Sequence, residues 1–373
     1  MPMAKLSSPG RAVARIPALI ATCTLLVSCS ASSAAQVSSP TPQPTPSAAT
    51  SPSASPSPAG LTLDEEIGAV MMVGFRGTLN DAVLADWSQR QFGGLLSINS
   101  NRNATTQASM NALIAAIRGA SRHRLIAATD QEGGQVCLAV ASVPCVPMPV
   151  GQAATTRMAA ALRSLGFDLD LGPVSDVCSG PSSIMWGRCY GTNPGSVAQA
   201  VGAVVDGIHA AGMLAAAKHF PGHGDTSVSS ETQLPRINES LATMKARDLP
   251  PFEADISHGV DFIMCGHLYY PALDPVRSAD LSPATMHMLR ADLGFQGAII
   301  SDDLEMGAIT ASTPTPEAAV EFLIAGGDMV MVAHDLAVAD ATYDAIRNAV
   351  LTGRLPRARL DEAVASLEAL PVR

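Results

Sequence analysis

The sequence predicts an α/β domain that folds as a (β/α)8 barrel of the TIM type, preceded by a signal peptide and a linker. Three observations predict it. Eight short apolar runs alternate with amphipathic stretches of helical length. The apolar runs lack polar alternation, which is typical of parallel strands buried on both faces. Polar side chains gather after the carboxyl ends of these runs, at the end where barrels carry their functional sites.

The expected elements follow one another in a regular order. Strands are expected at Ile67–Phe75, Gly93–Ile98, Leu125–Thr129, Leu169–Val174, Leu214–His219, Phe262–Cys265, Ala298–Ser301 and Met329–Val332. Helices are expected at Ala104–Ser121, Thr155–Leu165, Val197–Ala211, Ser282–Leu293, Pro316–Ala325 and Leu336–Leu351. A doubly wound open sheet is the alternative arrangement, but no Gly-rich nucleotide-binding loop supports it.

The first sixty residues are not expected to belong to the barrel. Lys5, Arg11 and Arg15 precede the apolar run Ile16–Val27, which is too short to span a bilayer and has the order of an export signal. Residues 1–28 are therefore predicted to be a signal peptide. Residues 29–60 are rich in Ser and Pro and cannot bury enough apolar surface to fold, so they are expected to form a disordered tether. A single folded domain, the barrel, is expected at residues 61–373.

The end of the signal resembles the lipobox of bacterial lipoproteins. It reads Leu26-Val27-Ser28-Cys29, and the resemblance implies that Cys29 is acylated and becomes the first residue of the mature chain. Two acyl chains would hold the protein stably on a membrane. The expected location is thus the extracytoplasmic face of the cell membrane, and an ordinary cleaved signal peptide is the alternative.

Composition excludes several classes of protein. The chain of 373 residues is 47% hydrophobic and 15% charged, with a net charge of −10. This content excludes a wholly disordered chain, and the negative charge argues against nucleic acid as a partner. Export permits disulfides, for which Cys137 with Cys145 and Cys178 with Cys189 are candidates, although four cysteines allow three pairings.

Polar groups follow most of the expected strands and should share one face of the barrel. They are Asp130-Gln131-Glu132, Ser175-Asp176, Lys218–Asp225, Gly266-His267, Ser301-Asp302-Asp303 and His334-Asp335. The segment Lys218–Asp225 contains two histidines, but its Pro and Gly residues exclude the helical spacing of a two-His metal site. It also lacks the end of a phosphate-binding loop. We therefore predict neither a metal nor an organic cofactor.

Three motifs resemble glycoside hydrolase family 3. They are KHFPGHGDT at Lys218–Thr226, AATDQEGG at Ala127–Gly134 and IISDDLEMGAI at Ile299–Ile309. The chain is similar to the single-barrel bacterial β-N-acetylglucosaminidases of that family, which act on peptidoglycan fragments, and the similarity runs from about Leu61 to Leu370. The resemblance implies a carbohydrate substrate, with Asp302 as the catalytic nucleophile.

The same resemblance implies the residues that hold the terminal sugar. These are Asp130, Arg188, Lys218 and His219. His267 ends the sixth expected strand and is expected to line the site too, with a structural imidazole as the alternative. Trp186 and Tyr190 flank Arg188 and either stack on a sugar or cover the core. Asp303 is expected to point away from the site, because adjacent side chains on a strand face opposite sides.

The sequence departs from the family at the acid/base. The related enzymes carry Asp-Ser-His after the Gly-His-Gly-Asp-Thr stretch, whereas this chain reads Ser229-Ser230-Glu231. In one interpretation Glu231 is the acid/base of an exo-acting retaining hydrolase that releases β-linked N-acetylglucosamine through a glycosyl–Asp302 intermediate. In another, the chain is a sugar-binding lipoprotein with impaired catalysis, and in a third a β-glycosidase of altered sugar preference. Transfer to phosphate is disfavoured, because an ionised Glu231 would repel the dianion.

Overall fold

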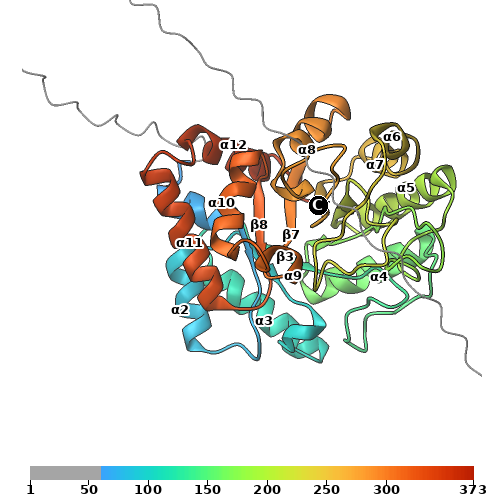
Figure 1. Ribbon diagram of the computed structural model, residues 1–373. Coiled ribbons are helices and arrows are strands. Elements are labelled where there is room, and N and C mark those ends of the chain that lie inside the picture. Colours follow the sequence, from blue (N-terminus) through green and yellow to red (C-terminus); the bar gives the residue numbers. More distant parts are fainter. Residues whose placement is uncertain (1–59) are drawn as a thin grey trace, which may run out of the picture. The chain divides into compact units, whose positions relative to one another are not determined.

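The computed structural model describes residues 60–373, which form a closed barrel of eight parallel strands surrounded by helices (Figure 1). The predicted signal peptide, the predicted lipidation site Cys29 and the predicted tether up to residue 59 lie outside the described residues. The strands are β1 (Met71–Val73), β2 (Gly94–Leu96), β3 (Ile126–Thr129), β4 (Leu169–Asp170), β5 (Leu214–Phe220), β6 (Phe262–Cys265), β7 (Ala298–Asp303) and β8 (Met329–Val332). Each pairs in parallel with its neighbour in the chain, and β1 closes the barrel on β8. The predicted barrel is confirmed, and the open sheet is excluded.

Helices connect the strands on the outside of the barrel. They are α1 (Leu63–Ala69), α2 (Asp81–Arg90), α3 (Gln107–Ala120), α4 (Gln152–Leu165), α5 (Pro194–Ala210), α6 (Leu241–Arg247), α7 (Leu249–Ser257), α8 (Pro283–His287), α9 (Gly307–Thr310), α10 (Thr315–Ala325), α11 (Leu336–Leu351) and α12 (Arg357–Glu368). Short 3₁₀ turns lie at Asn99–Asn101 and Ala279–Leu281. The helix expected over Ser282–Leu293 is divided into α8 and a π-helical turn, Met288–Asp292.

The first expected strand is wrong in its amino-terminal part. The apolar run Ile67–Phe75 begins inside α1, and only Met71–Val73 forms β1. Thr62 and Glu65 form a capping box, each side chain accepting a hydrogen bond from the other residue's backbone N–H. This cap satisfies N–H groups that have no partner within the helix, so the helix begins at Leu63 and continues into the apolar run.

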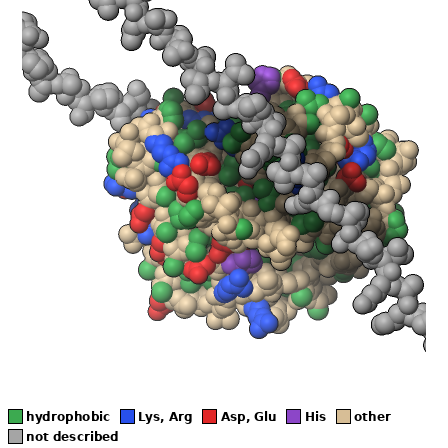
Figure 2. Space-filling view, viewed as in Figure 1, with side chains coloured by type: hydrophobic (Ala, Val, Ile, Leu, Met, Phe, Trp, Pro, Cys, Tyr) green, Lys and Arg blue, Asp and Glu red, His purple; other side chains and the backbone are tan. Residues whose placement is uncertain are grey.

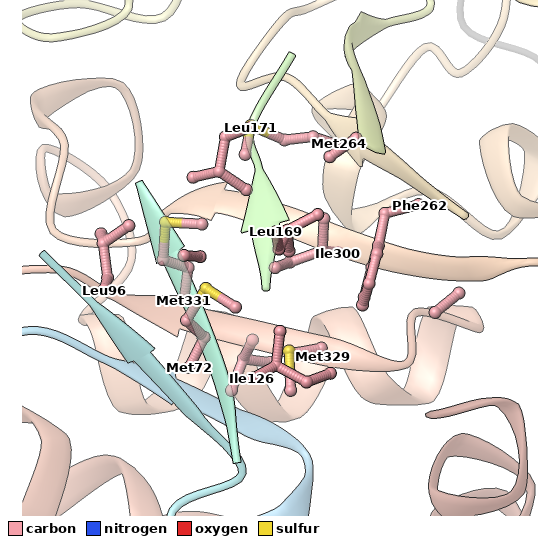
Figure 3. Close-up of a cluster of buried hydrophobic side chains, with 14 of the residues drawn as sticks. Met72, Leu96, Ile126, Leu169, Leu171, Phe262, Met264, Ile300, Met329 and Met331 are labelled. Atoms are coloured by element: carbon pink, nitrogen blue, oxygen red, sulfur yellow. The ribbon is translucent and has the colours of Figure 1, made fainter. Parts of the chain in front are cut away.

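Apolar side chains fill the interior of the barrel. Met72, Leu96, Ile126 and Met331 converge there in Figure 3, and all four are buried. Unbranched methionine fills irregular gaps between strands of different length. The close packing of this interior holds the strand ends, and the polar groups that follow them, in a fixed arrangement.

The surface carries charges of both signs. Acidic and basic side chains are interspersed on the face seen in Figure 2, and exposed pairs such as Arg347–Asp64 join neighbouring helices.

Among residues 60–373, no helix is both long enough and apolar enough to cross a membrane.

Candidate active site

A cavity of about 350 Å³ opens at the carboxyl ends of the strands. Six of the residues predicted from the sequence line it: Asp130, Arg188, Lys218, His219, Glu231 and Asp302. They lie at the carboxyl ends of β5 and β7 or in the segments that follow β3, β4 and β5, so the barrel brings together residues that are far apart in the chain. A second cavity of about 360 Å³, around Arg118, Arg163 and Asp168, lies at the opposite end. Both arginines there already bind Asp168, so that cavity is a charge-paired cluster rather than a candidate site.

Lys218 and Arg188 are held by a carboxylate that we did not predict. Lys218 Nζ lies 2.6 Å from Asp130 Oδ1 and 2.8 Å from Glu132 Oε1. Arg188 donates to both oxygens of Glu132, through Nε at 2.8 Å and Nη2 at 2.7 Å. Burial alone would raise the pKa of Glu132, but Lys218 and Arg188 lower it to about 2. Glu132 therefore orients both cations. Its position two residues after Asp130, in the same polar segment, is the sequence feature from which this role could have been predicted.

His219 is oriented by Asp176, which follows β4. The Nδ1 atom of His219 lies 2.8 Å from Asp176 Oδ2, and the other carboxylate oxygen accepts the backbone N–H of His223 at 2.6 Å. Asp176 is completely buried. The carboxylate of Asp176 thus fixes the orientation of the His219 imidazole and the conformation of the turn that follows β5.

His223 lies beside this pair and is bound to the next loop. Its Nε2 atom lies 3.1 Å from Ser230 Oγ. Burial, followed by the proximity of His219, lowers the pKa of His223 to about 4, so the ring is neutral at neutral pH. A neutral imidazole is a poor proton donor, and His223 is therefore not a substitute for the acid that the family carries.

The structure describes no cluster of three or more His, Cys, Asp or Glu residues within 60–373 that is arranged to hold a metal ion.

His267 does not lie on the cavity wall, contrary to our expectation of a sugar contact. It is 0% exposed, with Nδ1 at 3.0 Å from Asp280 Oδ2 and Nε2 at 2.8 Å from the carbonyl oxygen of Asp303. Because both ring nitrogens face acceptors, the ring carries two protons and a positive charge. Burial by itself would lower the pKa of His267, but Asp280 raises it to about 9. His267 is a buried cation beneath the strand end that carries Asp302.

This cation favours the ionised form of Asp302. Burial would raise the pKa of Asp302, but the charge of His267 and a hydrogen bond from the Asp303 N–H lower it below its ordinary value. That N–H donates to Asp302 Oδ1 at 2.9 Å. Asp302 is thus an ionised carboxylate on the cavity wall, as a nucleophile must be.

Asp303 also reaches the cavity wall, so the expectation that only one of the two carboxylates would do so is wrong. The pairing register between β7 and β8 shifts between Ile300 and Asp303, and such an irregularity breaks the strict alternation of side chains. The Oδ1 atom of Asp303 accepts the N–H groups of Glu305 and Ala333, both at 3.1 Å. Burial raises the pKa of Asp303 to about 7. These contacts give Asp303 a structural role in the loop after β7.

Glu231 is exposed at the mouth of the cavity, on the loop after β5. Partial burial of its carboxyl group and then the negative charge of Asp302 raise the pKa of Glu231, against the opposing charge of Arg188. Its carbonyl oxygen accepts the N–H of Gly307 at 2.9 Å, and the Ser230 carbonyl accepts the N–H of Ala308 at 3.0 Å. The loop is therefore attached to the start of α9, just after the strand that carries Asp302.

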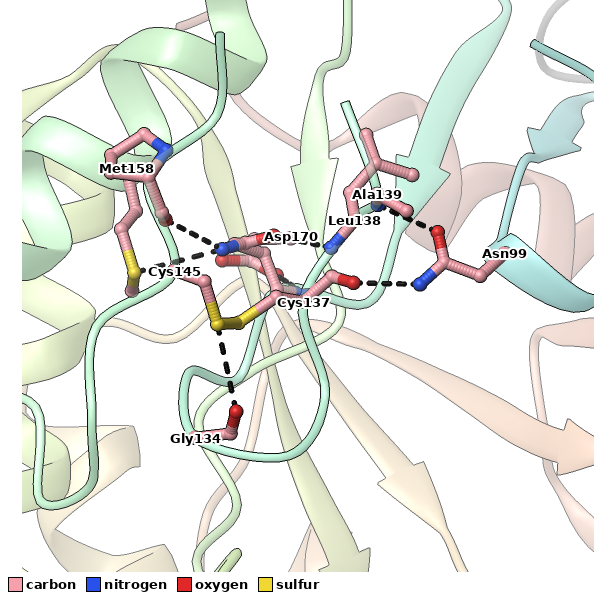
Figure 4. Close-up of a disulfide and its surroundings, with 10 residues drawn as sticks. Asn99, Gly134, Cys137, Leu138, Ala139, Cys145, Met158 and Asp170 are labelled. Atoms are coloured by element: carbon pink, nitrogen blue, oxygen red, sulfur yellow. Dashed lines mark hydrogen bonds between the residues drawn. A yellow bond between two sulfur atoms is a disulfide. The ribbon is translucent and has the colours of Figure 1, made fainter. Parts of the chain in front are cut away.

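Two disulfides staple the loops beside the cavity. Cys137 is bonded to Cys145, as Figure 4 shows, and Cys178 is bonded to Cys189. Cys265 is a free thiol and buried. Gln135 donates from Nε2 to the carbonyl oxygen of Trp186 at 3.4 Å, so the two stapled loops touch each other. Each disulfide restricts a loop that carries or borders the cation network of the site, which consists of Lys218 and Arg188 with the carboxylates of Asp130 and Glu132.

The two aromatic residues beside Arg188 differ in their environments. Tyr190 packs against the buried cluster of Val177, Val197 and Val201. Trp186 is 46% exposed and is not among the residues that line the cavity. Tyr190 therefore covers the core, whereas Trp186 is exposed to solvent outside the cavity.

An ionised carboxylate and a carboxyl group of raised pKa in one cavity of a barrel are what glycoside hydrolysis requires. The fold and site define the protein as a glycoside hydrolase. Residues 62–370 match the model of the glycosyl hydrolase family 3 N terminal domain, and the chain belongs to that family.

Individual relatives agree with this assignment. The chain is 32% identical over 313 residues to a beta-hexosaminidase of Stenotrophomonas maltophilia, covering 78% of this chain and 92% of the relative. It is 35% identical over 270 residues to a beta-hexosaminidase of Tolumonas auensis, covering 69% and 80%. A solved family 3 beta-N-acetylglucosaminidase from Paenibacillus superposes with a TM-score of 0.79 at 31% identity, covering 83% of this chain and 62% of that longer one.

Proposed function

We propose that the protein is an exo-acting, retaining β-N-acetylglucosaminidase in which Asp302 is the nucleophile and Glu231 the acid/base. The observation that carries this proposal is the separation of the two pKa values: that of Asp302 is lowered and that of Glu231 is raised. Environments that separate the pKa values of two neighbouring carboxyl groups assign one as base or nucleophile and the other as acid.

The proposed reaction has two steps. Asp302 attacks the anomeric carbon of the terminal sugar while Glu231 transfers its proton to the departing glycosidic oxygen, which leaves a glycosyl–Asp302 ester and an ionised Glu231. Glu231 then takes a proton from a water molecule, whose oxygen attacks the same carbon and releases Asp302. The sugar leaves with its original anomeric configuration, and both side chains return to their starting states.

The cation network is the proposed sugar-binding part of the cavity. Lys218, Arg188 and Asp130 form charged hydrogen-bonding groups that suit the hydroxyl groups of a terminal sugar. The related hexosaminidases support N-acetylglucosamine as that sugar. The predicted signal peptide and the lipobox-like sequence around Cys29 lead us to propose cell-wall fragments, outside the cytoplasm, as the substrate.

A sugar-binding lipoprotein that has lost catalysis remains the competing function, because Glu231 replaces the usual histidine. We would compare hydrolysis of an aryl β-N-acetylglucosaminide by the wild type, Asp302→Asn and Glu231→Gln. We expect Asp302→Asn to abolish turnover and Glu231→Gln to lower it about 10²–10⁴-fold for a poor leaving group. An inactive wild type that binds N-acetylglucosamine would establish the binding protein instead. Full activity of Glu231→Gln would place the acid/base elsewhere.

A further inference from the structure

The loop that carries Glu231 is bound at both of its ends by one arginine. Arg247, the last residue of α6, places Nη1 3.0 Å from Asp225 Oδ2 and Nη2 2.8 Å from Glu239 Oε2. Asp225 precedes Glu231 in the chain and Glu239 follows it. The guanidinium group thus joins the two ends of the segment 225–239.

The arginine is itself held rigidly. Asp248, which joins α6 to α7, accepts from Nε of Arg247 at 2.9 Å and from Nη2 at 3.1 Å. Its side chain is 0% exposed and that of Glu239 is 6% exposed. A planar guanidinium bound on several sides keeps a defined orientation, unlike a lysine ammonium group.

Three carboxyl groups surround this single positive charge. Burial, and then the neighbouring Asp248, raise the pKa of Glu239 to about 8, which favours its protonated form at neutral pH. The cluster therefore carries little excess charge around its two buried members, Glu239 and Asp248. None of its members lines the cavity, so the cluster has no direct contact with a bound sugar there.

The remainder of the loop is attached independently of the arginine. The Ile237 N–H donates to the Tyr269 carbonyl at 2.9 Å, and the Tyr269 N–H donates to the Pro235 carbonyl at 2.8 Å. Between these contacts and Asp225, the loop tip at Ser230 and Glu231 is bound by its main chain only to the start of α9. On the amino-terminal side of the tip, the Thr226 carbonyl accepts the Ile184 N–H at 2.8 Å, and the Asp225 arm of Arg247 is the ionic attachment.

We propose that Arg247 is a positioning residue for the acid/base: by binding Asp225 and Glu239 it holds Glu231 in place opposite Asp302. The inference rests on the proposed role of Glu231. It predicts that the loss of Arg247 affects the step that needs a proton donor, rather than the binding of the sugar.

The test uses two substrates that differ in their need for an acid, phenyl and 2,4-dinitrophenyl β-N-acetylglucosaminide. In the full-length protein, we expect Arg247→Gln to lower kcat/KM for the phenyl substrate by about 10–10²-fold, a part of what the acid contributes. For the dinitrophenyl substrate, which needs no proton, kcat/KM should change little. Inhibition by free N-acetylglucosamine should be unchanged, and Arg247→Lys should recover part of the loss. Arg354→Gln removes an exposed arginine–carboxylate pair with Glu317, away from the cavity, and is the matched control.

A double variant shows whether Arg247 acts through Glu231. If it does, Arg247→Gln lowers kcat/KM for the phenyl substrate far less in a Glu231→Gln background than in the wild type. Equal losses for both substrates, full additivity with Glu231→Gln, or no loss would each overturn the proposal. If Arg247→Gln does not fold, Asp225→Asn removes one arm from a half-exposed position and is judged by the same criteria. A Glu231→Gln variant without leaving-group dependence would overturn the proposed function itself, which is a separate outcome.

Discussion

The N–H of Gly307 donates a hydrogen bond to the carbonyl oxygen of Glu231 at 2.9 Å, which joins the segment after β7 to the loop after β5. A Cβ atom on residue 307 would lie 2.8 Å from the carbonyl oxygens of Glu231 and Thr232. Glycine is therefore required there by close approach of two main chains. The contact sets the position of the proposed acid relative to the proposed nucleophile.

Gly307→Ala should displace Glu231 and lower activity more than stability. We expect kcat/KM for a phenyl glycoside to fall roughly tenfold, because small misplacements of a catalytic group are costly. Gly119→Ala is the control, since a Cβ there meets nothing within 4 Å in the last turn of α3. That change should leave kinetics unchanged and stabilise the fold by no more than about 0.5–1 kcal/mol, the gain expected in a helix interior. Equal kinetics for the two variants would show that the Gly307 contact is not needed for catalysis.

Glu132→Gln should weaken sugar binding and destabilise the barrel. The change leaves buried Lys218 and partly buried Arg188 with less compensating charge, and breaking a buried ion pair such as Lys218–Glu132 typically costs about 3–5 kcal/mol. We expect a higher KM, a lower denaturation midpoint in urea and partial recovery in Glu132→Asp. Glu317→Gln breaks an exposed pair and should cost no more than about 1 kcal/mol. A Glu132→Gln protein as stable as Glu317→Gln would contradict the proposed network.

His267 should make stability depend on pH in the neutral to alkaline range. Its folded pKa, about 9, lies above the ordinary value of 6.5, so the folded state binds the proton more tightly. The resulting stabilisation is fully present below about pH 6.5 and is lost as pH rises towards 9, by at most roughly 3 kcal/mol.

Urea unfolding of wild type and His267→Gln near both ends of that range measures this effect. Subtracting the unfolding free energies of the two proteins cancels the contributions of other groups that titrate in this range, such as Glu239 and Asp255. The difference should shrink or reverse at the higher pH. A difference that is constant with pH would show that His267 is not charged in the folded protein.

The pH dependence of kcat/KM should reflect the two carboxyl groups in opposite directions. Activity should rise as Asp302 ionises, below its ordinary pKa, and fall as Glu231 loses its proton, above its ordinary pKa. In Glu231→Gln the fall at higher pH should disappear for the phenyl substrate, which needs the proton donor, while the rise at lower pH remains. An unchanged alkaline limb in that variant would assign it to another group.

The barrel and the face that carries the site were both predictable from the sequence. Apolar runs without alternation indicate buried parallel strands, and the motifs around Asp130, Lys218 and Asp302 follow such runs directly. The start of β1 was not predictable from the apolar run Ile67–Phe75, because a buried helix and a buried strand are equally apolar over a few residues. The capping box at Thr62 decided between them.

The sequence by itself determined which residues reach the carboxyl face of the barrel, because strand order and strand direction follow from the pattern of apolar runs. Only the tertiary structure decided what each one does there. Glu132 became the carboxylate that holds two cations, and His267 became a buried cation rather than a sugar contact. These roles depend on charges and hydrogen-bond partners from distant segments, such as Asp280 and Arg188. Such partners approach within a few ångströms only when the barrel closes, and no local sequence pattern specifies that distance.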